Sequence, residues 1–70
     1  MTEAEIKKLQ NYLRIKFGNE SFRLVDRIKS TDSVEVYLAD EFIGTLYRDD
    51  EDGEISYDFN MAILEIDLPQ

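Results

Sequence analysis

The sequence predicts an α+β fold: one N-terminal helix packed on a three- to four-stranded antiparallel β-meander. Three observations predict it. Apolar residues near the start recur at spacings of three and four, which is typical of one helix face. From Val34 onward they alternate with polar residues, which is typical of half-buried strands. Because one helix is followed by strands alone, we expect antiparallel hairpins with the helix on one face.

The helix is predicted at about residues 3–17. Thr2 and Glu5 fit a capping box, in which the hydroxyl accepts a hydrogen bond from an unpaired backbone amide and the carboxylate reaches back. Gly18 followed by Asn19 is a common stop signal. The apolar residues between these ends form one stripe, which consists of Ile6, Leu9, Leu13 and Phe17.

Runs of alternating residues predict the strands. The first run covers Phe22–Lys29 and ends at a polar turn cluster, residues 30–33. Three further strands are predicted within Val34–Leu68. Asp52-Gly53 lies between two of them and is a strong hairpin signal, because a type I′ turn needs positive φ at both central residues.

Two registers fit this hairpin, and both are internally consistent. If Asp52-Gly53 is a two-residue loop, Leu46 faces Phe59 and the preceding connection is a three-residue turn at residues 39–41. If the acidic turn instead spans residues 49–53, the preceding connection has two residues, and the core face consists of Ile43, Thr45 and Tyr47. A slip of one residue exchanges every side chain between the two faces of a strand.

The segment of residues 61–68 also has two interpretations. Its apolar residues fall on odd positions up to Ile63 and on even positions from Leu64. This change predicts a β-bulge or the start of a new strand. Glu65 and Asp67 continue to alternate with aliphatic residues, which favours a strand over a short helix.

Residues 1–70 are predicted to form a single domain. A chain of this length buries only roughly 60% of the surface that its unfolded form exposes. Disulfides, a metal or oligomerisation usually support such small domains. The sequence has no cysteine and no histidine, which excludes disulfides and the commonest zinc sites. We therefore expect a homo-oligomer, most simply a dimer.

The net charge of -8 is unevenly distributed. Residues 1–29 carry seven Lys and Arg against four Asp and Glu, so their net charge is +3. Residues 30–70 carry one Arg against twelve Asp and Glu, so theirs is -11. A negative charge of this size repels phosphate groups, so we expect no nucleic-acid partner. A basic protein partner is an alternative to attraction between the two halves of the chain.

We expect neither a membrane span nor secretion. The longest unbroken aliphatic run is residues 61–64, far short of the ~20 residues that cross a bilayer. The first residues form a charged helix without the apolar core of a secretory signal. The expected location is therefore the cytoplasm, with no membrane partner.

The acidic turn, Asp49–Glu54, partly imitates a calcium-binding loop. With Gly53 at the sixth position of such a loop, Arg48 would occupy position one and Phe59 position twelve, so two ligand positions, including the bidentate acid, are lost. The turn is interpreted as a solvated hairpin tip, and no metal site is predicted. A weak divalent-metal sensor or enzyme at this turn is an alternative.

No catalytic residue and no cofactor-binding residue is predicted. General acid–base catalysis needs carboxylates whose surroundings separate their pKa values, whereas these acids cluster on turns or alternate outward on strands. No Ser, Lys or Tyr has a recognisable base beside it in the sequence. We therefore expect a protein that is not an enzyme and uses no cofactor.

Several residues are candidates for a protein interface, namely Ile15, Tyr37, Phe42, Leu46 and Tyr57. Ile15 lies opposite the apolar stripe of the helix, so it is either an isolated surface aliphatic or a protein contact. The other four are expected on the uncovered sheet face if the helix covers the face of Val34 in the second register. One short helix cannot cover both faces, and an uncovered apolar face usually marks an interface.

Three stretches have recognisable sequences: MTEAEIKKLQNYLRIKFGN, VEVYLADEFIGTLYRDDEDGEISYDF and MAILEIDL. Together they resemble a small bacterial family known as domain of unknown function 3126. The likeness covers nearly the whole chain, with residues 20–33 as its divergent part. It implies a short, soluble, single-domain bacterial protein, and it supplies no activity and no catalytic residues.

The function expected from these observations is that of a small non-enzymatic protein-interaction module. We expect it to be a homodimer joined through the uncovered sheet face or a sheet edge, where backbone hydrogen bonds and aromatic side chains would form the contact. The alternative from another class is an acidic-surface regulator that docks on a basic protein.

Overall fold

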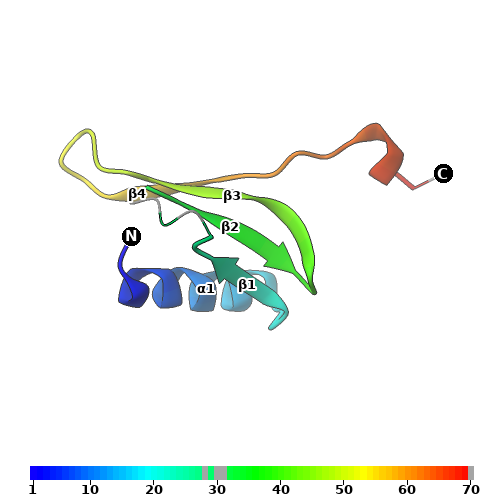
Figure 1. Cartoon of the computed structure of the whole chain (residues 1–70), viewed down its shortest axis with the longest axis horizontal. Helices are drawn as coiled ribbons and strands as arrows, with labels where there is room; N and C mark the ends of the chain where they lie inside the picture. The colour runs from blue at the N-terminus through cyan, green and yellow to red at the C-terminus, as the bar shows by residue number, and fades with distance from the viewer. Residues whose placement is uncertain (28, 30–31, 70) are drawn as a thin grey trace.

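The computed structural model describes residues 1–27, 29 and 32–69. Within them, one helix is followed by an antiparallel meander and a short 3₁₀ turn (Figure 1). The sheet order is β1-β2-β3-β4, which confirms the predicted α+β fold with four strands. The elements are α1 (Glu3–Phe17), β1 (Phe22–Val25), β2 (Ser33–Leu38), β3 (Glu41–Asp49), β4 (Ser56–Asn60) and η1 (Glu65–Asp67).

Both ends of α1 are closed by local hydrogen bonds, as predicted. The amide of Glu5 donates to Thr2 Oγ1 at 3.1 Å, and the Thr2 amide donates to Glu5 Oε1 at 3.3 Å. Gly18 adopts the left-handed conformation with φ 59°. Its amide donates to the carbonyl of Ile15, and the Asn19 amide donates to the carbonyl of Arg14. This pair of bonds is a Schellman motif, which satisfies carbonyls that the last turn leaves unpaired.

The register of β3 and β4 is the first of the two predicted alternatives, because Leu46 lies opposite Phe59. The preceding connection is not the predicted three-residue turn. Ala39 and Asp40 form a two-residue turn with φ of 49° and 68°. A shift in register then leaves Ile43 without a direct partner on β2, so a β-bulge supplies the extra residue.

The loop between β3 and β4 is longer than the two-residue loop of that register. Strand pairing ends at Asp49 and Ser56, and the Gly53 amide donates to the Asp50 carbonyl at 3.3 Å. Gly53 has φ 80°, which glycine adopts without steric cost. Asp52-Gly53 therefore lies at the tip of a wider acidic turn.

The hydrophobic core lies between α1 and one face of the sheet (Figure 1). Phe17 near the end of α1 stacks on Phe22 of β1 with ring centroids 5.2 Å apart. The other side of the sheet is not covered by the helix. The buried core residues are Leu13, Phe22, Leu24, Val34, Val36 and Leu46.

Two predicted segments differ from the structure. The first strand was predicted over Phe22–Lys29 but ends at Val25, and Ile28 lies outside the described residues. The strand favoured for residues 61–68 is also wrong: β4 ends at Asn60 and is followed by non-strand backbone and the single turn η1. This segment has no neighbouring strand in the sheet, so its alternating sequence has no ladder to join.

No helix in the described part of the chain is long and apolar enough to cross a membrane.

Candidate functional site

The five predicted interface residues lie on three different surfaces. Ile15 is 82% exposed on the solvent side of α1. Tyr37 and Phe42 pair across β2 and β3 on the uncovered sheet face. Leu46 is only 3% exposed, and it lies with Tyr57 on the face covered by the helix. The prediction that these last two lie on the uncovered face is therefore wrong, because it depended on the second register.

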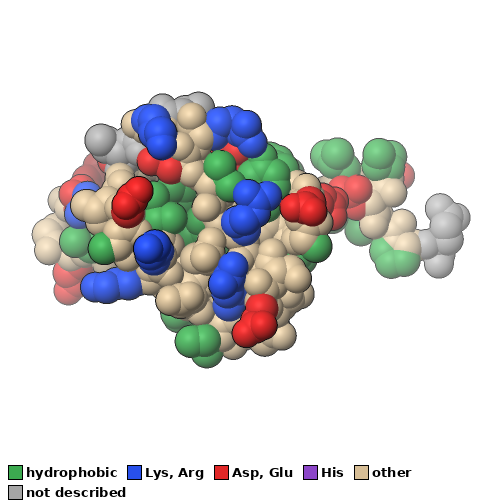
Figure 2. Space-filling model, turned by 60° about the horizontal axis from the view of Figure 1, so that its bottom comes forward, with side chains coloured by type: hydrophobic (Ala, Val, Ile, Leu, Met, Phe, Trp, Pro, Cys, Tyr) green, Lys and Arg blue, Asp and Glu red, His purple; other side chains and the backbone are tan. Residues whose placement is uncertain are grey.

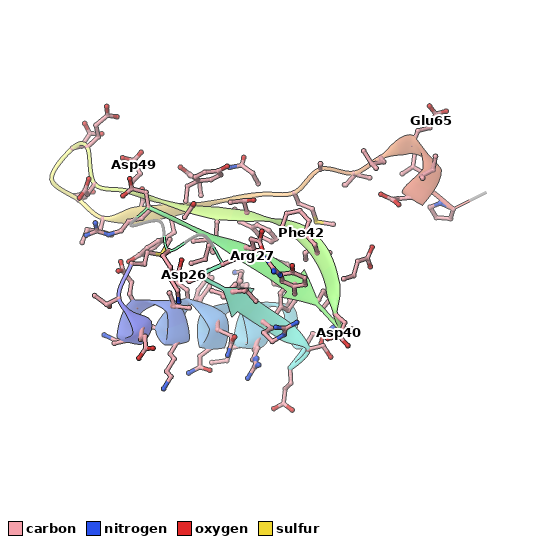
Figure 3. All side chains as sticks on the ribbon, viewed as in Figure 1. Asp26, Arg27, Asp40, Phe42, Asp49 and Glu65 are labelled. Carbon is pink, nitrogen blue, oxygen red and sulfur yellow. The ribbon has the colours of Figure 1, made fainter. Side chains whose placement is uncertain are left out.

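Tyr37 is the centre of a polar and aromatic cluster on the uncovered face. The Arg23 guanidinium lies 5.0 Å from its ring centroid, and the Phe42 ring meets it edge-on at 5.7 Å. Arg27 donates to the Tyr37 hydroxyl and to Glu35, both at 2.9 Å. The uncovered face thus carries both aromatic rings and paired charges. Arg27 and Phe42 of this cluster are labelled in Figure 3. Whether Tyr37, Phe42 or Ile15 contacts a partner stays a prediction.

A second polar cluster joins the start of α1 to the β3–β4 hairpin. The Tyr57 hydroxyl donates a hydrogen bond to Glu5. Arg48 Nε lies 3.0 Å from Glu5 Oε2, and Arg48 Nη1 lies 3.2 Å from Asp50 Oδ2. These contacts hold the first turn of the helix against the far end of the hairpin.

The pKa values of this cluster follow from the same contacts. The hydrogen bond from Tyr57 lowers the pKa of Glu5, with partial burial acting in the opposite direction. The same bond and partial burial raise the pKa of the Tyr57 hydroxyl. Partial burial disfavours the Arg48 cation, but the carboxylates of Glu5 and Asp50 outweigh it and raise its pKa. At neutral pH, Glu5 and Arg48 are therefore both charged and Tyr57 is neutral, so the cluster combines an ion pair with a tyrosine hydrogen bond.

An apolar groove runs between α1 and the β4 side of the sheet. Its volume is about 480 Å³. Glu5 and Lys8 are its charged members, and the rest of its lining is apolar or aromatic. Tyr12 on its rim is an exposed large side chain. The other lining residues are Leu9, Leu13, Leu46, Tyr57 and Phe59.

The two edge strands of the sheet differ in whether side chains form hydrogen bonds with their backbone. At the β1 edge, the Leu24 amide donates to Gln10 Oε1 at 3.0 Å, and Arg14 Nε donates to the Phe22 carbonyl at 2.9 Å. Side chains of α1 thus form hydrogen bonds with backbone groups of β1, and these groups are not available to another strand. Among the described residues, no comparable side-chain bond reaches the backbone of β4, which is the other end of the sheet.

The C-terminal segment, residues 61–69, extends past the end of β4 and away from the helix (Figure 1), and some of its residues line a hollow beside β3. Figure 2 shows hydrophobic side chains on the part of the segment that projects from the folded body. Glu65, labelled in Figure 3, lies on this projecting part, away from the helix. Its hydrogen bonds are local, for example from the Leu64 amide to Asp67 Oδ2 at 3.2 Å. The exposed large apolar residues in it are Met61, Ile63, Leu64, Ile66 and Leu68.

This segment is not among the interface residues that the sequence predicts. Its alternating pattern was detected but was assigned to a strand, and strand residues were expected to be half-buried. The signal that could have identified an interface is the length of the alternating apolar run around β4, which continues past Asn60, where β4 ends. The run consists of Ile55, Tyr57, Phe59, Met61 and Ile63.

The acidic turn Asp49–Glu54 is held by local contacts. Asp49 Oδ1 accepts from the Glu51 amide at 3.0 Å, and Asp50 pairs with Arg48. Across the residues that the structure describes, which include the whole turn, no group of three or more Asp and Glu side chains could hold a metal ion.

Comparison with known proteins gives one match. A family model described as a protein of unknown function, DUF3126, matches residues 5–67. This confirms the resemblance predicted from the sequence. No curated protein and no solved structure matches the chain.

Proposed function

The chain belongs to this family of unknown function, and we propose that it is a non-enzymatic protein-interaction module that works as a homodimer. The observation that carries the proposal is the C-terminal segment. It presents five large apolar side chains to solvent, and none of them belongs to the core cluster. Contiguous exposed apolar surface of this kind usually marks a protein interface.

The size of the core supports association. A domain of 70 residues buries only roughly 60% of its unfolded surface. The chain has no cysteine to form disulfides, so a second copy is the simplest source of further burial. Association would remove part of the exposed segment and the open edge of the groove beside α1 from water.

The arrangement of titratable groups supports a non-enzymatic role. Among the described residues, the shifted pKa values belong to Glu5, Arg48 and Tyr57, which form one cluster, and to Arg27, which forms a second cluster by donating to Glu35 and Tyr37. Each of these clusters ties secondary-structure elements together. A catalytic acid or base would instead need a free site beside it for a substrate atom.

Sedimentation velocity across the micromolar range tests this function. We expect a concentration-dependent species of twice the chain mass of 8.2 kDa. A single species of 8.2 kDa at every concentration would overturn the homodimer.

A second candidate is an acidic regulator that docks on a basic protein. The observation that favours it is the exposed acidic turn, which projects at one end of the sheet (Figure 1). Binding through this turn should weaken strongly as salt is added, because screening reduces attraction between exposed charges. The cytoplasmic location expected for either function stays a prediction.

A further inference from the structure

We infer that β4 of one copy pairs antiparallel with β4 of a second copy, in a register centred on Phe59, so that two sheets of four strands join into one. This inference rests on the proposed homodimer and specifies its interface. Four observations support it: the length of the apolar stripe, the open sheet edge, the symmetry of the stripe and the position of the groove.

The apolar stripe around β4 is longer than the strand itself. It occupies alternate positions and consists of Ile55, Tyr57, Phe59, Met61 and Ile63. In the single chain, β4 covers only Ser56–Asn60. The stripe residues beyond these ends are 55%, 52% and 66% exposed, in chain order. The sequence thus encodes a half-buried strand of about nine residues, of which one chain pairs only the central part.

The free edge of β4 is available for such pairing. The opposite edge, on β1, is occupied by Gln10 and Arg14 from the helix. An unprotected edge presents unpaired amides and carbonyls that readily bind another strand. The chain therefore protects one edge and leaves open the edge that carries the extended stripe.

The stripe is symmetric about Phe59, which defines the register. In a two-fold pair centred there, Tyr57 lies opposite Met61 of the second copy, and Ile55 lies opposite Ile63. On the other face, Asp58 lies opposite Asn60. Every stripe residue then faces another apolar residue, as a self-complementary interface requires.

The neighbouring registers are less favourable. A pair centred on Asp58 would place that carboxylate opposite its own copy, and directly opposed like charges destabilise a sheet. A pair centred on Asn60 would place Ile55 opposite Glu65. Registers shifted by a single residue from the proposed one would set apolar side chains against the polar face.

The same pairing extends the groove beside α1. Tyr57 and Phe59 lie on the helix side of the sheet and line the groove. In the proposed register, Met61 of the second copy lies opposite Tyr57, Phe59 of the second copy lies opposite Phe59, and these side chains are on the same side of the joined sheet. They would therefore extend the apolar surface at the open edge of the groove, where Tyr12 is exposed. The paired strands would be about 30 Å long.

Charge gives the interface a distinctive salt dependence. The proposed register brings the acidic turn of one copy near Glu65 and Asp67 of the other, and each chain has a net charge of -8. These charges repel, so screening by salt should strengthen the dimer. Docking of the acidic turn on a basic protein should show the opposite trend.

Single-cysteine spin labels test the geometry, since the chain has no cysteine of its own. In the proposed register, Ser56 lies opposite Ala62 of the second copy, and the two Ser56 positions are about 20 Å apart. Labelled Ser56→Cys should give this distance by pulsed electron paramagnetic resonance. Arg23→Cys on β1 should give about 39 Å, because the two β1 strands are seven strand spacings apart, about 34 Å, and each Arg23 lies three residues, about 10 Å, along the strand from the level of Phe59 in opposite directions. A dimer with a different Ser56 distance would overturn this register while leaving the homodimer intact. A chain that stays monomeric would overturn both proposals.

Matched aspartate variants test which residues form the contact. Ile63 and Ile66 are both exposed in the single chain, so neither Ile63→Asp nor Ile66→Asp should disturb its fold. Ile63→Asp should raise the dimer Kd at least about tenfold, because it places a charge within the apolar stripe. Ile66→Asp, which lies outside the stripe, should leave Kd within about threefold. Equal effects of the two variants, or a dimer that weakens as salt is added, would contradict the inferred interface.

Discussion

Replacing Gly44 with alanine probes the close approach between β3 and β4. A Cβ atom at this position would lie 2.3 Å from the carbonyl oxygen of Asn60 and 2.9 Å from Cε1 of Phe59. Favourable carbon contacts lie at about 3.5–4.0 Å, so the two strands must move apart. Overpacking of this kind costs about 1–3 kcal/mol, whereas the loss of glycine flexibility in a strand contributes roughly 0.5–1 kcal/mol of stability. We expect Gly44→Ala to lower the free energy of unfolding by about 1–2 kcal/mol.

Urea unfolding at one protein concentration measures this change, and a double-mutant cycle identifies its cause. Phe59→Leu removes the ring contact but not the contact with the Asn60 carbonyl. In the Phe59→Leu background, Gly44→Ala should therefore destabilise the protein less than it does in the original, by at least about 0.5 kcal/mol. Gly18→Ala is the control, because no atom lies within 4 Å of the added Cβ there and the cost comes from its φ of 59°. A Gly44→Ala protein as stable as the original, or equal coupling at both glycines, would refute this reasoning.

Three further predictions concern the contacts of α1. Thr2→Ala should lower the free energy of unfolding by about 1 kcal/mol, because it removes the side-chain acceptor of the capping box; an unchanged urea midpoint would contradict this role. Gln10→Ala should cost about 1 kcal/mol and increase hydrogen exchange at the Leu24 amide more than at amides paired within the sheet. Because folding lowers the pKa of Glu5, this carboxylate contributes stability that is fully present when the pH is above 4.5, its ordinary pKa. This contribution is lost as the pH falls through the folded pKa. The raised pKa of Tyr57 contributes stability that is complete below 10.0 and is lost as the pH rises through the folded pKa. Tyr57→Phe should therefore flatten the dependence of stability on pH in both ranges, and an unaltered pH profile would show that the hydrogen bond to Glu5 does not contribute.

The helix was predicted with its ends because its signals are local. The capping box of Thr2 and Glu5 and the stop at Gly18 each join residues a few positions apart, so the sequence shows all the atoms involved. The spacing of Leu9 and Leu13 similarly predicts which side of the helix meets the sheet. Tertiary contacts did not alter the helix that these local signals predict.

The candidate site was predicted less completely, because it depends on register. Two registers were consistent with the alternation around Leu46, and they assign opposite faces to it and to Tyr57. The choice reflects contacts between distant residues: Phe59 packs over Gly44, where no side chain occupies the space. The β-bulge at Ile43 then reconciles this register with the tight turn before it.

By itself, the sequence determined one helix, the alternating strands, the charge division and the family. These follow from short-range hydrogen bonds, from periodicity and from composition. Only the tertiary structure decided which sheet face α1 covers, which sheet edge it protects and where β4 ends. A strand continues only while a neighbour supplies hydrogen bonds, and β3 pairs with β4 no further than Asn60. The alternation of apolar residues beyond Asn60 can therefore be read from the sequence, whereas the exposure of these residues follows only from the folded structure.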